Sequence, residues 1–94
     1  MPAPAIRKLS VVIPAYNEAA TIADTIDRVK GAEIGPLDLE IIVVDDGSRD
    51  RTREILKGIP GIRTVFHERN RGKGGAVKTG FRAATGDVLL IQDA

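Results

Sequence analysis

Cysteine is absent from this chain of 94 residues, which excludes disulfide bonds, zinc–thiolate sites and thiol catalysis. Aromatic residues are few, with one Tyr, two Phe and no Trp, so a surface on which nucleic-acid bases stack is not expected. The longest apolar runs, residues 41–44 and 88–91, are far shorter than the roughly 20 residues of a membrane-spanning helix. We therefore expect no transmembrane segment. The remaining composition, 43% hydrophobic and 29% charged, is ordinary for one small globular domain.

The net charge of +1 hides a strongly basic middle segment. Residues 49–82 carry ten Lys or Arg and three Asp or Glu, a net charge of +7. Residues 1–48 carry four Lys or Arg and eight Asp or Glu, a net charge of −4. The basic segment suits either a nucleic acid or a smaller polyanion such as a diphosphate. Because aromatic residues are scarce, we expect no nucleic-acid partner.

Short apolar runs alternate with segments of helical period along the chain. The apolar runs are contiguous rather than alternating, which is typical of buried parallel strands. They cover residues 9–13, 39–44, 62–66 and 88–91.

Helices are expected between these strands. They cover residues 18–30, with Asn17 as N-cap and Glu18 in the first turn, residues 50–57, and residues 76–84. The order β-α-β-α-β-α-β predicts an α/β fold, a mainly parallel, Rossmann-like sheet with helices on both faces.

The two ends of the chain lie outside this pattern. Residues 1–8 contain two prolines close together and are expected to form a loose leader. The chain stops just after the fourth strand, where the residues at a strand end should continue into a loop. We therefore expect residues 9–94 to be the first, truncated part of a larger domain.

Polar side chains follow three of the four expected strands. They are Tyr16, Asn17 and Glu18 after the first strand, Asp45 and Asp46 after the second, and Gln92 and Asp93 after the fourth. Each group also has a purely structural interpretation, as a turn, a helix cap or a polar chain end. In parallel α/β sheets, however, ligands bind outside the carboxyl ends of the strands. Three polar clusters at that rim predict a binding site there.

The segment 70–75 is basic, rich in glycine and leads into the third helix. Backbone N–H groups, the helix dipole and the charges of Arg71 and Lys73 favour an anion there. The segment is neither a Walker loop nor a dinucleotide fingerprint, because Val77 stands at the third glycine position. A flexible surface loop with solvated charges is the alternative. His67, just before this segment, is expected to be a surface residue without a partner.

Four short motifs occur in order along the chain. They are residues 11–18 (VVIPAYNE), 43–48 (VVDDGS), 70–76 (NRGKGGA), and 86–87 with 92–94 (GD and QDA). Together they resemble the family 2 glycosyltransferases of the GT-A fold, in particular the dolichol- and polyprenyl-phosphate sugar transferases. The resemblance covers nearly all of residues 9–94. It implies an inverting transfer of a sugar from a nucleoside diphosphate sugar, such as GDP-mannose or UDP-glucose, to a lipid phosphate. It also implies a cytoplasmic location, at the cytoplasmic face of a membrane.

The resemblance implies a nucleoside pocket at the ends of the first two strands. Asp45 would hydrogen-bond the base, and Asp46 would lie near the ribose. The other residues expected to line this pocket are Pro14, Ala15, Tyr16 and Glu18.

The resemblance also implies a diphosphate and metal site. Asn70 and Lys73 would lie near the nucleoside and the diphosphate. Asp93, with Gln92 beside it, would be the first carboxylate of a D-x-D motif that binds Mg²⁺ or Mn²⁺, hard ions that prefer oxygen ligands. No residue is assigned as a catalytic base.

Two other function classes are alternatives to the glycosyltransferase. A nucleotide-binding module without catalysis is the main alternative, and transfer or hydrolysis of a donor would distinguish the two. A receiver-like signalling domain places its acidic pair after the first strand, whereas Asp45 and Asp46 follow the second.

The fourth strand lies inside the sheet in the family that the chain resembles. Here residues 88–91 would be an exposed sheet edge. We therefore expect self-association or marginal stability.

Overall fold

Four parallel strands form one sheet in the order β3-β2-β1-β4 in the computed structural model, which describes residues 5–94. The strands are β1 (Lys8–Ala15), β2 (Asp38–Asp45), β3 (Arg63–Phe66) and β4 (Val88–Ile91). The helices are α1 (Ile22–Lys30), α2 (Thr52–Lys57) and α3 (Gly72–Ala83). The expected α/β class and parallel sheet are therefore confirmed.

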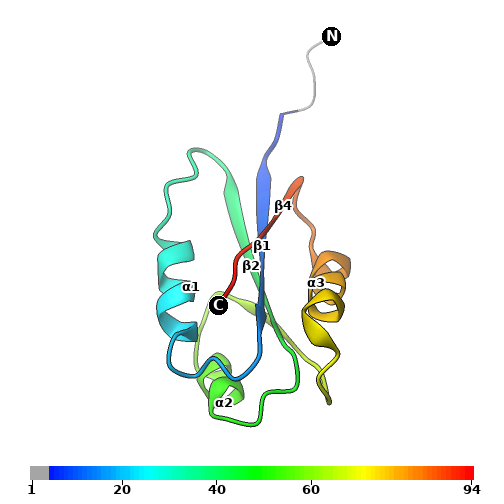
Figure 1. The fold of residues 1–94 in the computed structure, drawn as a ribbon. Coiled ribbons are helices and arrows are strands. Elements are labelled where there is room, and N and C mark those ends of the chain that lie inside the picture. Colours follow the sequence, from blue (N-terminus) through cyan, green and yellow to red (C-terminus); the bar gives the residue numbers. More distant parts are fainter. Residues whose placement is uncertain (1–4) are drawn as a thin grey trace.

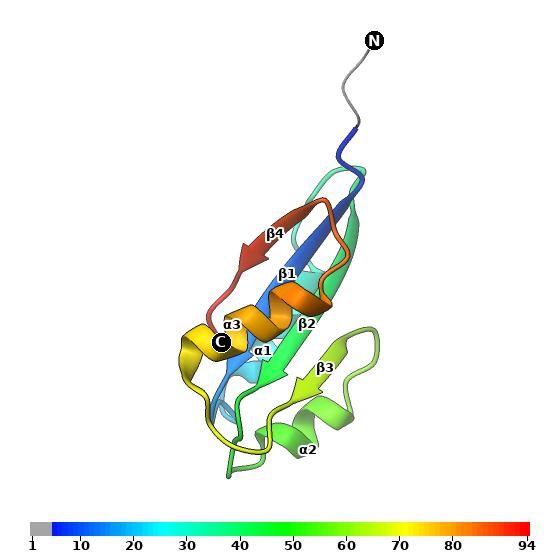
Figure 2. The same ribbon diagram turned by 90° about the vertical axis from the view of Figure 1, so that its right-hand side faces the viewer.

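Helices cover both faces of the sheet, as Figures 1 and 2 show. α1 and α2 lie on one face and α3 on the other. On the first face, Ile22 and Ile26 of α1 and Leu56 of α2 pack on apolar side chains of β1 and β2. On the other face, Ala76 of α3 packs on Ile42 and Val44. The carboxyl ends of β1 and β2 point to the lower end of Figure 1, opposite the N-terminus.

β1 is longer than expected at both ends. Lys8 is its first residue, and its backbone N–H donates to Asp87. Of the leader expected over residues 1–8, residues 1–4 lie outside the described part of the chain. At the other end β1 runs through Pro14 to Ala15, beyond the expected end at residue 13. A proline is tolerated there because the pairing of β1 with β4 ends at Val12.

α1 begins later than expected, because Asn17 does not cap it. The backbone of Asn17 has φ 52°, in the left-handed region, which asparagine tolerates better than most residues. Its side-chain oxygen accepts the N–H of Arg49 at 2.8 Å, so it caps the loop after β2 instead. Thr21 precedes the first helical residue, Ile22.

α3 begins at Gly72, so the glycine-rich run that was expected to be a loop forms the first turn of the helix. Gly80, further along α3, lies directly against β1. A Cβ at Gly80 would overlap a methyl group of Val12. The helix can therefore approach the sheet closely only because this position lacks a side chain.

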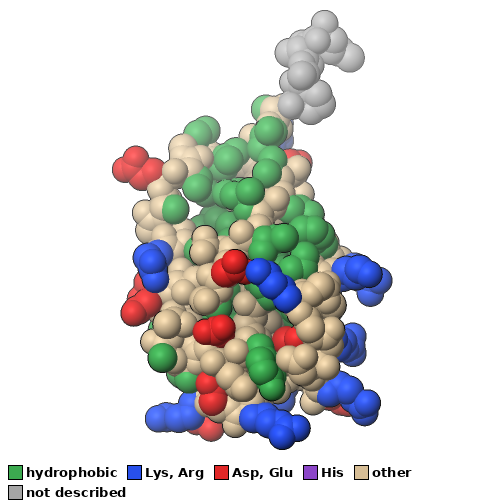
Figure 3. Space-filling view, viewed as in Figure 1, with side chains coloured by type: hydrophobic (Ala, Val, Ile, Leu, Met, Phe, Trp, Pro, Cys, Tyr) green, Lys and Arg blue, Asp and Glu red, His purple; other side chains and the backbone are tan. Residues whose placement is uncertain are grey.

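β4 forms one edge of the sheet, as expected, but it is not the buried strand that its sequence indicated. Leu89, Leu90 and Ile91 are 37%, 52% and 47% exposed. Figure 3 faces this edge and shows hydrophobic side chains gathered over the region of β4. Contiguous apolar residues predict a strand inside the sheet that is buried on both faces. β4 instead lies at the edge, with a neighbouring strand on one side only.

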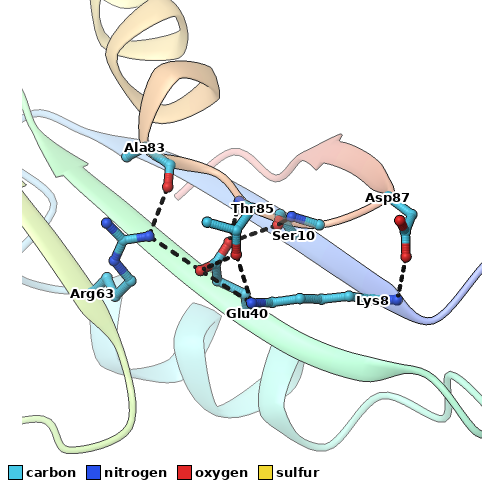
Figure 4. A network of polar contacts seen from close by, with 8 residues as sticks. Lys8, Ser10, Glu40, Arg63, Ala83, Thr85 and Asp87 are labelled. Carbon is cyan, nitrogen blue, oxygen red and sulfur yellow. Dashed lines mark hydrogen bonds and ion pairs between the residues drawn. The ribbon is translucent and has the colours of Figure 1, made fainter.

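A polar network joins the amino ends of the strands, at the end of the sheet opposite the rim (Figure 4). Glu40 of β2 is at its centre, beside its register partner Ser10 of β1. Its carboxylate accepts the Ser10 hydroxyl at 2.7 Å and the Thr85 N–H at 2.9 Å, and it pairs with Arg63 at 3.1 Å. Burial raises the pKa of Glu40, but the hydrogen bonds from Thr85, Ser10 and Arg63 outweigh it and lower the pKa from 4.5 to about 2. The network therefore holds the α3–β4 connection against the sheet as long as Glu40 is ionised.

No helix among residues 5–94 has the length and apolar character needed to cross a membrane.

Candidate functional site

One pocket at the carboxyl ends of the strands contains most of the residues that the sequence singled out. Its volume is about 370 Å³. Eight of the ten candidates line it: Pro14, Ala15, Tyr16, Glu18, Asp46, Asn70, Lys73 and Asp93. Ala76 and Ala94 complete the lining. Residues from four separate stretches of the chain thus converge on one concave surface, as the rim of a parallel sheet allows.

The turn after β1 is held by the loop after β2. The N–H of Asn17 donates to the Ser48 hydroxyl at 2.8 Å, and the N–H of Glu18 donates to the Thr52 hydroxyl at 2.9 Å. Tyr16 is left 43% exposed beside the pocket. The turn is therefore fixed by its backbone, and the Tyr16 and Glu18 side chains remain available to a ligand.

Asp50, just before α2, ties these two loops together. Its carboxylate accepts the Thr52 hydroxyl at 2.5 Å and the Ala19 N–H at 3.2 Å. The Thr52 hydroxyl is the main cause of the lowered pKa of Asp50. The contact of Asp50 with Ala19, 31 residues away, cannot be inferred from local sequence.

Asp45 is fully buried and does not line the pocket. Its Oδ2 accepts the Ser48 N–H at 3.2 Å and lies 3.5 Å from Nε of Arg53. The guanidinium of Arg53 in turn lies 4.8 Å from the centre of the Phe66 ring. Oδ1 of Asp45 is buried without a hydrogen-bond partner among the described residues. An orphaned carboxylate oxygen is costly, and it marks a place where a donor group would be stabilised.

Asp46 lines the pocket and is only 3% exposed. Its Oδ1 accepts the N–H of Arg71 at 2.8 Å and lies 2.8 Å from Nδ1 of His67. The expectation that His67 is a surface residue without a partner is wrong, because its side chain is 4% exposed and bonded at both ring nitrogens. The partners of His67 are 21 and 12 residues away in the sequence, so no local pattern shows them.

Lys73 and Asp93 form an ion pair across the mouth of the pocket. The Lys73 Nζ and Asp93 Oδ1 atoms are 2.5 Å apart, and the side chains are 62% and 71% exposed. A pair this exposed contributes little to stability. Breaking this ion pair therefore costs little free energy, and each side chain can bind a ligand instead.

Gln92 lines a different pocket, of about 490 Å³, bordered by α1, β1 and β4. Its amide donates to the Asp93 carbonyl at 3.0 Å. The structure therefore does not bring Gln92 into the rim pocket, although it is next to Asp93 in sequence.

The carboxylates of the rim provide a limited set of metal ligands. Within residues 5–94 no three or more His, Cys, Asp or Glu side chains are grouped so that they could hold a metal ion. Mg²⁺ is commonly held by one or two carboxylates together with substrate phosphates. Asp93 therefore fits a divalent cation as one ligand, shared with a bound diphosphate.

The sequence model described as Glycosyl transferase family 2 matches residues 10–94. The chain belongs to this family. The curated relatives of this family 2 chain include an undecaprenyl-phosphate 4-deoxy-4-formamido-L-arabinose transferase of Enterobacter sp. (strain 638), 42% identical over 96% of the chain. A dolichol-phosphate mannosyltransferase of Pyrococcus furiosus is 38% identical over 93% of the chain. The chain spans 29% and 25% of the length of these two proteins.

Solved structures share the fold of the family 2 chain. A mannosyltransferase from Pyrobaculum calidifontis in complex with GDP-Man and Mn²⁺ matches with a TM-score of 0.81 and 33% identity. The match covers 99% of the chain and 29% of that protein. A glucosyl-3-phosphoglycerate synthase from Mycobacterium tuberculosis, in complex with Mn²⁺, UDP and glucosyl-3-phosphoglycerate, matches with a TM-score of 0.72 and 38% identity. That match covers 93% of the chain and 33% of the synthase. Both structures contain a nucleotide together with Mn²⁺.

Proposed function

We propose that this family 2 chain carries the donor-binding part of an inverting glycosyltransferase that takes its sugar from a nucleoside diphosphate sugar. The observation that carries the proposal is the rim pocket, which combines acidic groups, an aromatic side chain and Lys73. Carboxylates accept hydrogen bonds from ribose hydroxyls and base N–H groups, and a lysine ammonium binds phosphate. The base is assigned to Asp45, whose Oδ1 has no partner; because Asp45 is fully buried outside the pocket, this contact requires that Oδ1 become exposed when the nucleotide binds.

In the proposed reaction, an acceptor oxygen attacks the anomeric carbon while the nucleoside diphosphate leaves. Negative charge grows on the diphosphate, and the Lys73 ammonium at the mouth of the pocket would stabilise it. A divalent cation, Mg²⁺ or Mn²⁺, held by Asp93 and the diphosphate would supply further neutralisation of that charge. Asp93 would release Lys73 when it takes the cation.

The acceptor that we propose is a polyprenyl or dolichyl phosphate, and the supporting observation is the names of the two curated relatives. A phosphate oxygen is already ionised near neutral pH, so the attacking group needs no strong base. Such an acceptor would place the reaction at the cytoplasmic face of a membrane.

Calorimetric titration of the chain with GDP and with UDP, each with and without Mn²⁺, tests the donor site. We expect saturable binding of one nucleotide and about tenfold weaker binding by Lys73→Ala, since one charge-assisted hydrogen bond is worth about 1.4 kcal/mol or more. Lys78→Ala is the matched control, because Lys78 is also exposed on α3 but does not line the pocket. Absence of binding to either nucleotide by the folded chain would contradict the proposal.

A nucleotide-binding module without catalysis is the second candidate. It is supported by the same pocket, whose residues suit nucleotide binding and none of which is assigned as a catalytic base. Release of free sugar from GDP-mannose or UDP-glucose by the chain would exclude it.

The exposed edge of β4 leads us to propose self-association of the chain. An apolar edge strand offers unpaired backbone groups to a second strand, here that of another copy. In sedimentation velocity we expect the average mass to rise with concentration. Leu90→Lys, at a 52% exposed position, should shift the chain toward monomer. A monodisperse monomer at every concentration would rule out this association.

A further inference from the structure

The buried histidine at the end of β3 has no part in the proposed chemistry. His67 follows β3, and its backbone N–H donates to the carbonyl of Asp45 at 2.8 Å. Its ring lies between the end of β2 and α3. Nδ1 is 2.8 Å from Asp46 Oδ1, and Nε2 is 2.8 Å from the Thr79 hydroxyl of α3. The ring is thus held on both sides by hydrogen bonds and has one orientation.

The direction of the bond to Asp46 follows from the chemistry of its partners. An ionised carboxylate only accepts, so Nδ1–H of His67 donates to Oδ1. The same oxygen accepts the N–H of Arg71 at 2.8 Å. Oδ2 of Asp46 makes no hydrogen bond within residues 5–94, and Asp46 lines the rim pocket. Two donors on one oxygen therefore fix the carboxylate and leave the other oxygen for a ligand.

The bond from Arg71 connects this carboxylate to the start of α3. Arg71 immediately precedes Gly72, the first residue of the helix, and it lies between two pocket residues, Asn70 and Lys73. The position of Asp46 therefore also sets the position of the segment that contributes these two side chains.

We infer that His67 is a positioning residue of the donor site, which holds Asp46 toward the nucleotide and, through Asp46, holds the segment from Asn70 to Lys73. The inference rests on the proposed function for its effect on nucleotide affinity. The expected effect on the Arg71 N–H is independent of the proposed function, because it is a property of the chain without nucleotide.

Two variants of His67 separate positioning from packing. His67→Leu fills much of the space but has no donor for Asp46. His67→Asn is smaller but keeps an N–H where Nδ1 stood. Nucleotide affinity is measured by calorimetry with GDP and UDP, and folding by circular dichroism. We expect His67→Leu to weaken binding about tenfold, and His67→Asn to bind within threefold of the original chain. A role in packing alone predicts the reverse order, because the asparagine leaves the larger cavity.

Amide hydrogen exchange gives a readout that needs no nucleotide. In His67→Leu the Arg71 amide should exchange at least tenfold faster, while amides in β1 and β2 stay protected. In His67→Asn the Arg71 amide should keep its protection. If His67→Leu does not fold, the asparagine variant alone decides, and faster exchange at Arg71 in a folded His67→Asn chain overturns the inference.

The two proposals fail in different ways. If the original chain binds neither GDP nor UDP, the proposed donor site is contradicted, together with the effect of His67 on nucleotide affinity. Binding by the original chain with unchanged affinity in His67→Leu, or unchanged Arg71 exchange in that variant, overturns only the positioning role of His67.

Discussion

Replacing Gly47 with alanine is expected to lower the free energy of unfolding by about 3 kcal/mol. Gly47 has φ 76°, in the left-handed region that only glycine adopts without strain. A Cβ there would lie 2.7 Å from the backbone carbon of Arg69 and 2.7 Å from the backbone nitrogen of Asn70. Backbone atoms cannot rotate away as a side chain can, so the segment before α3 must move. Thermal or urea unfolding measures the loss.

Gly35 is the matched control for this prediction. It has φ 65° and no atom within 4 Å of the Cβ that alanine would add. Gly35→Ala therefore carries only the cost of the left-handed conformation, about 1 kcal/mol. Because Gly47 contacts Asn70, Gly47→Ala should also weaken nucleotide binding, whereas Gly35→Ala should not. Equal losses of stability in the two variants would show that the close approach to Arg69 and Asn70 is relieved without cost.

Replacing Glu40 with alanine is expected to cost about 2–4 kcal/mol, because it leaves several donors of one network without an acceptor. Ser10 and the Thr85 N–H lose their acceptor together, and Arg63 keeps only the Ala83 carbonyl. Ser10 is fully buried, so its hydroxyl has no access to water as a substitute. Denaturant unfolding of Glu40→Ala near neutral pH measures the effect. Glu33→Ala, at an exposed glutamate outside this network, should change stability by less than about 0.5 kcal/mol.

The contribution of Glu40 should depend on pH in a defined direction. Its pKa is lowered to about 2 in the folded chain from an ordinary value of 4.5. The group therefore stabilises the fold fully above about pH 4.5, and this contribution is lost as the pH falls toward 2. The pKa of Asp87 is also lowered, mainly by the Arg7 N–H, and so is the pKa of Asp50. Both groups titrate alike in the original chain and in Glu40→Ala. The stability difference between the original chain and Glu40→Ala isolates Glu40, and a difference independent of pH over this window would contradict the assignment.

The sheet and its binding rim were predictable because both follow from patterns that are local in sequence. Contiguous β-branched runs mark β1 and β2, and the rule for parallel sheets places the residues after them at one rim. Eight of the ten candidate residues accordingly share one pocket. Gln92 does not; it lines the neighbouring pocket of about 490 Å³, whereas Asp93 lines both pockets.

The partners of His67 and Asn17 were not predictable, because they are set by tertiary contacts. Asn17 is of a residue type that often caps helices, but its hydrogen bonds with Ser48 and Arg49 on the neighbouring loop hold it in a left-handed turn. Intrinsic propensity predicts a loop for the segment before Ala76, which contains Gly72, Gly74 and Gly75, but this segment is helical in the structure.

The Glu40 network has a signal in the sequence. Ser10 and Glu40 are single polar residues inside otherwise apolar strands, at positions that turn out to be register partners. Isolated polar residues in two neighbouring buried strands favour a shared hydrogen bond, because a buried polar group without a partner is costly.

The strand order has a consequence for how the chain acquires its structure. β1 leaves the ribosome before the other three strands, but it lies between β2 and β4 in the sheet. Its pairing with β4 joins Val12 to Ile91, residues separated by most of the chain. Contacts between residues so distant in sequence slow folding, because a long loop must close before they can form. Of these four strands, the first to be synthesised is therefore the last to gain both of its neighbours.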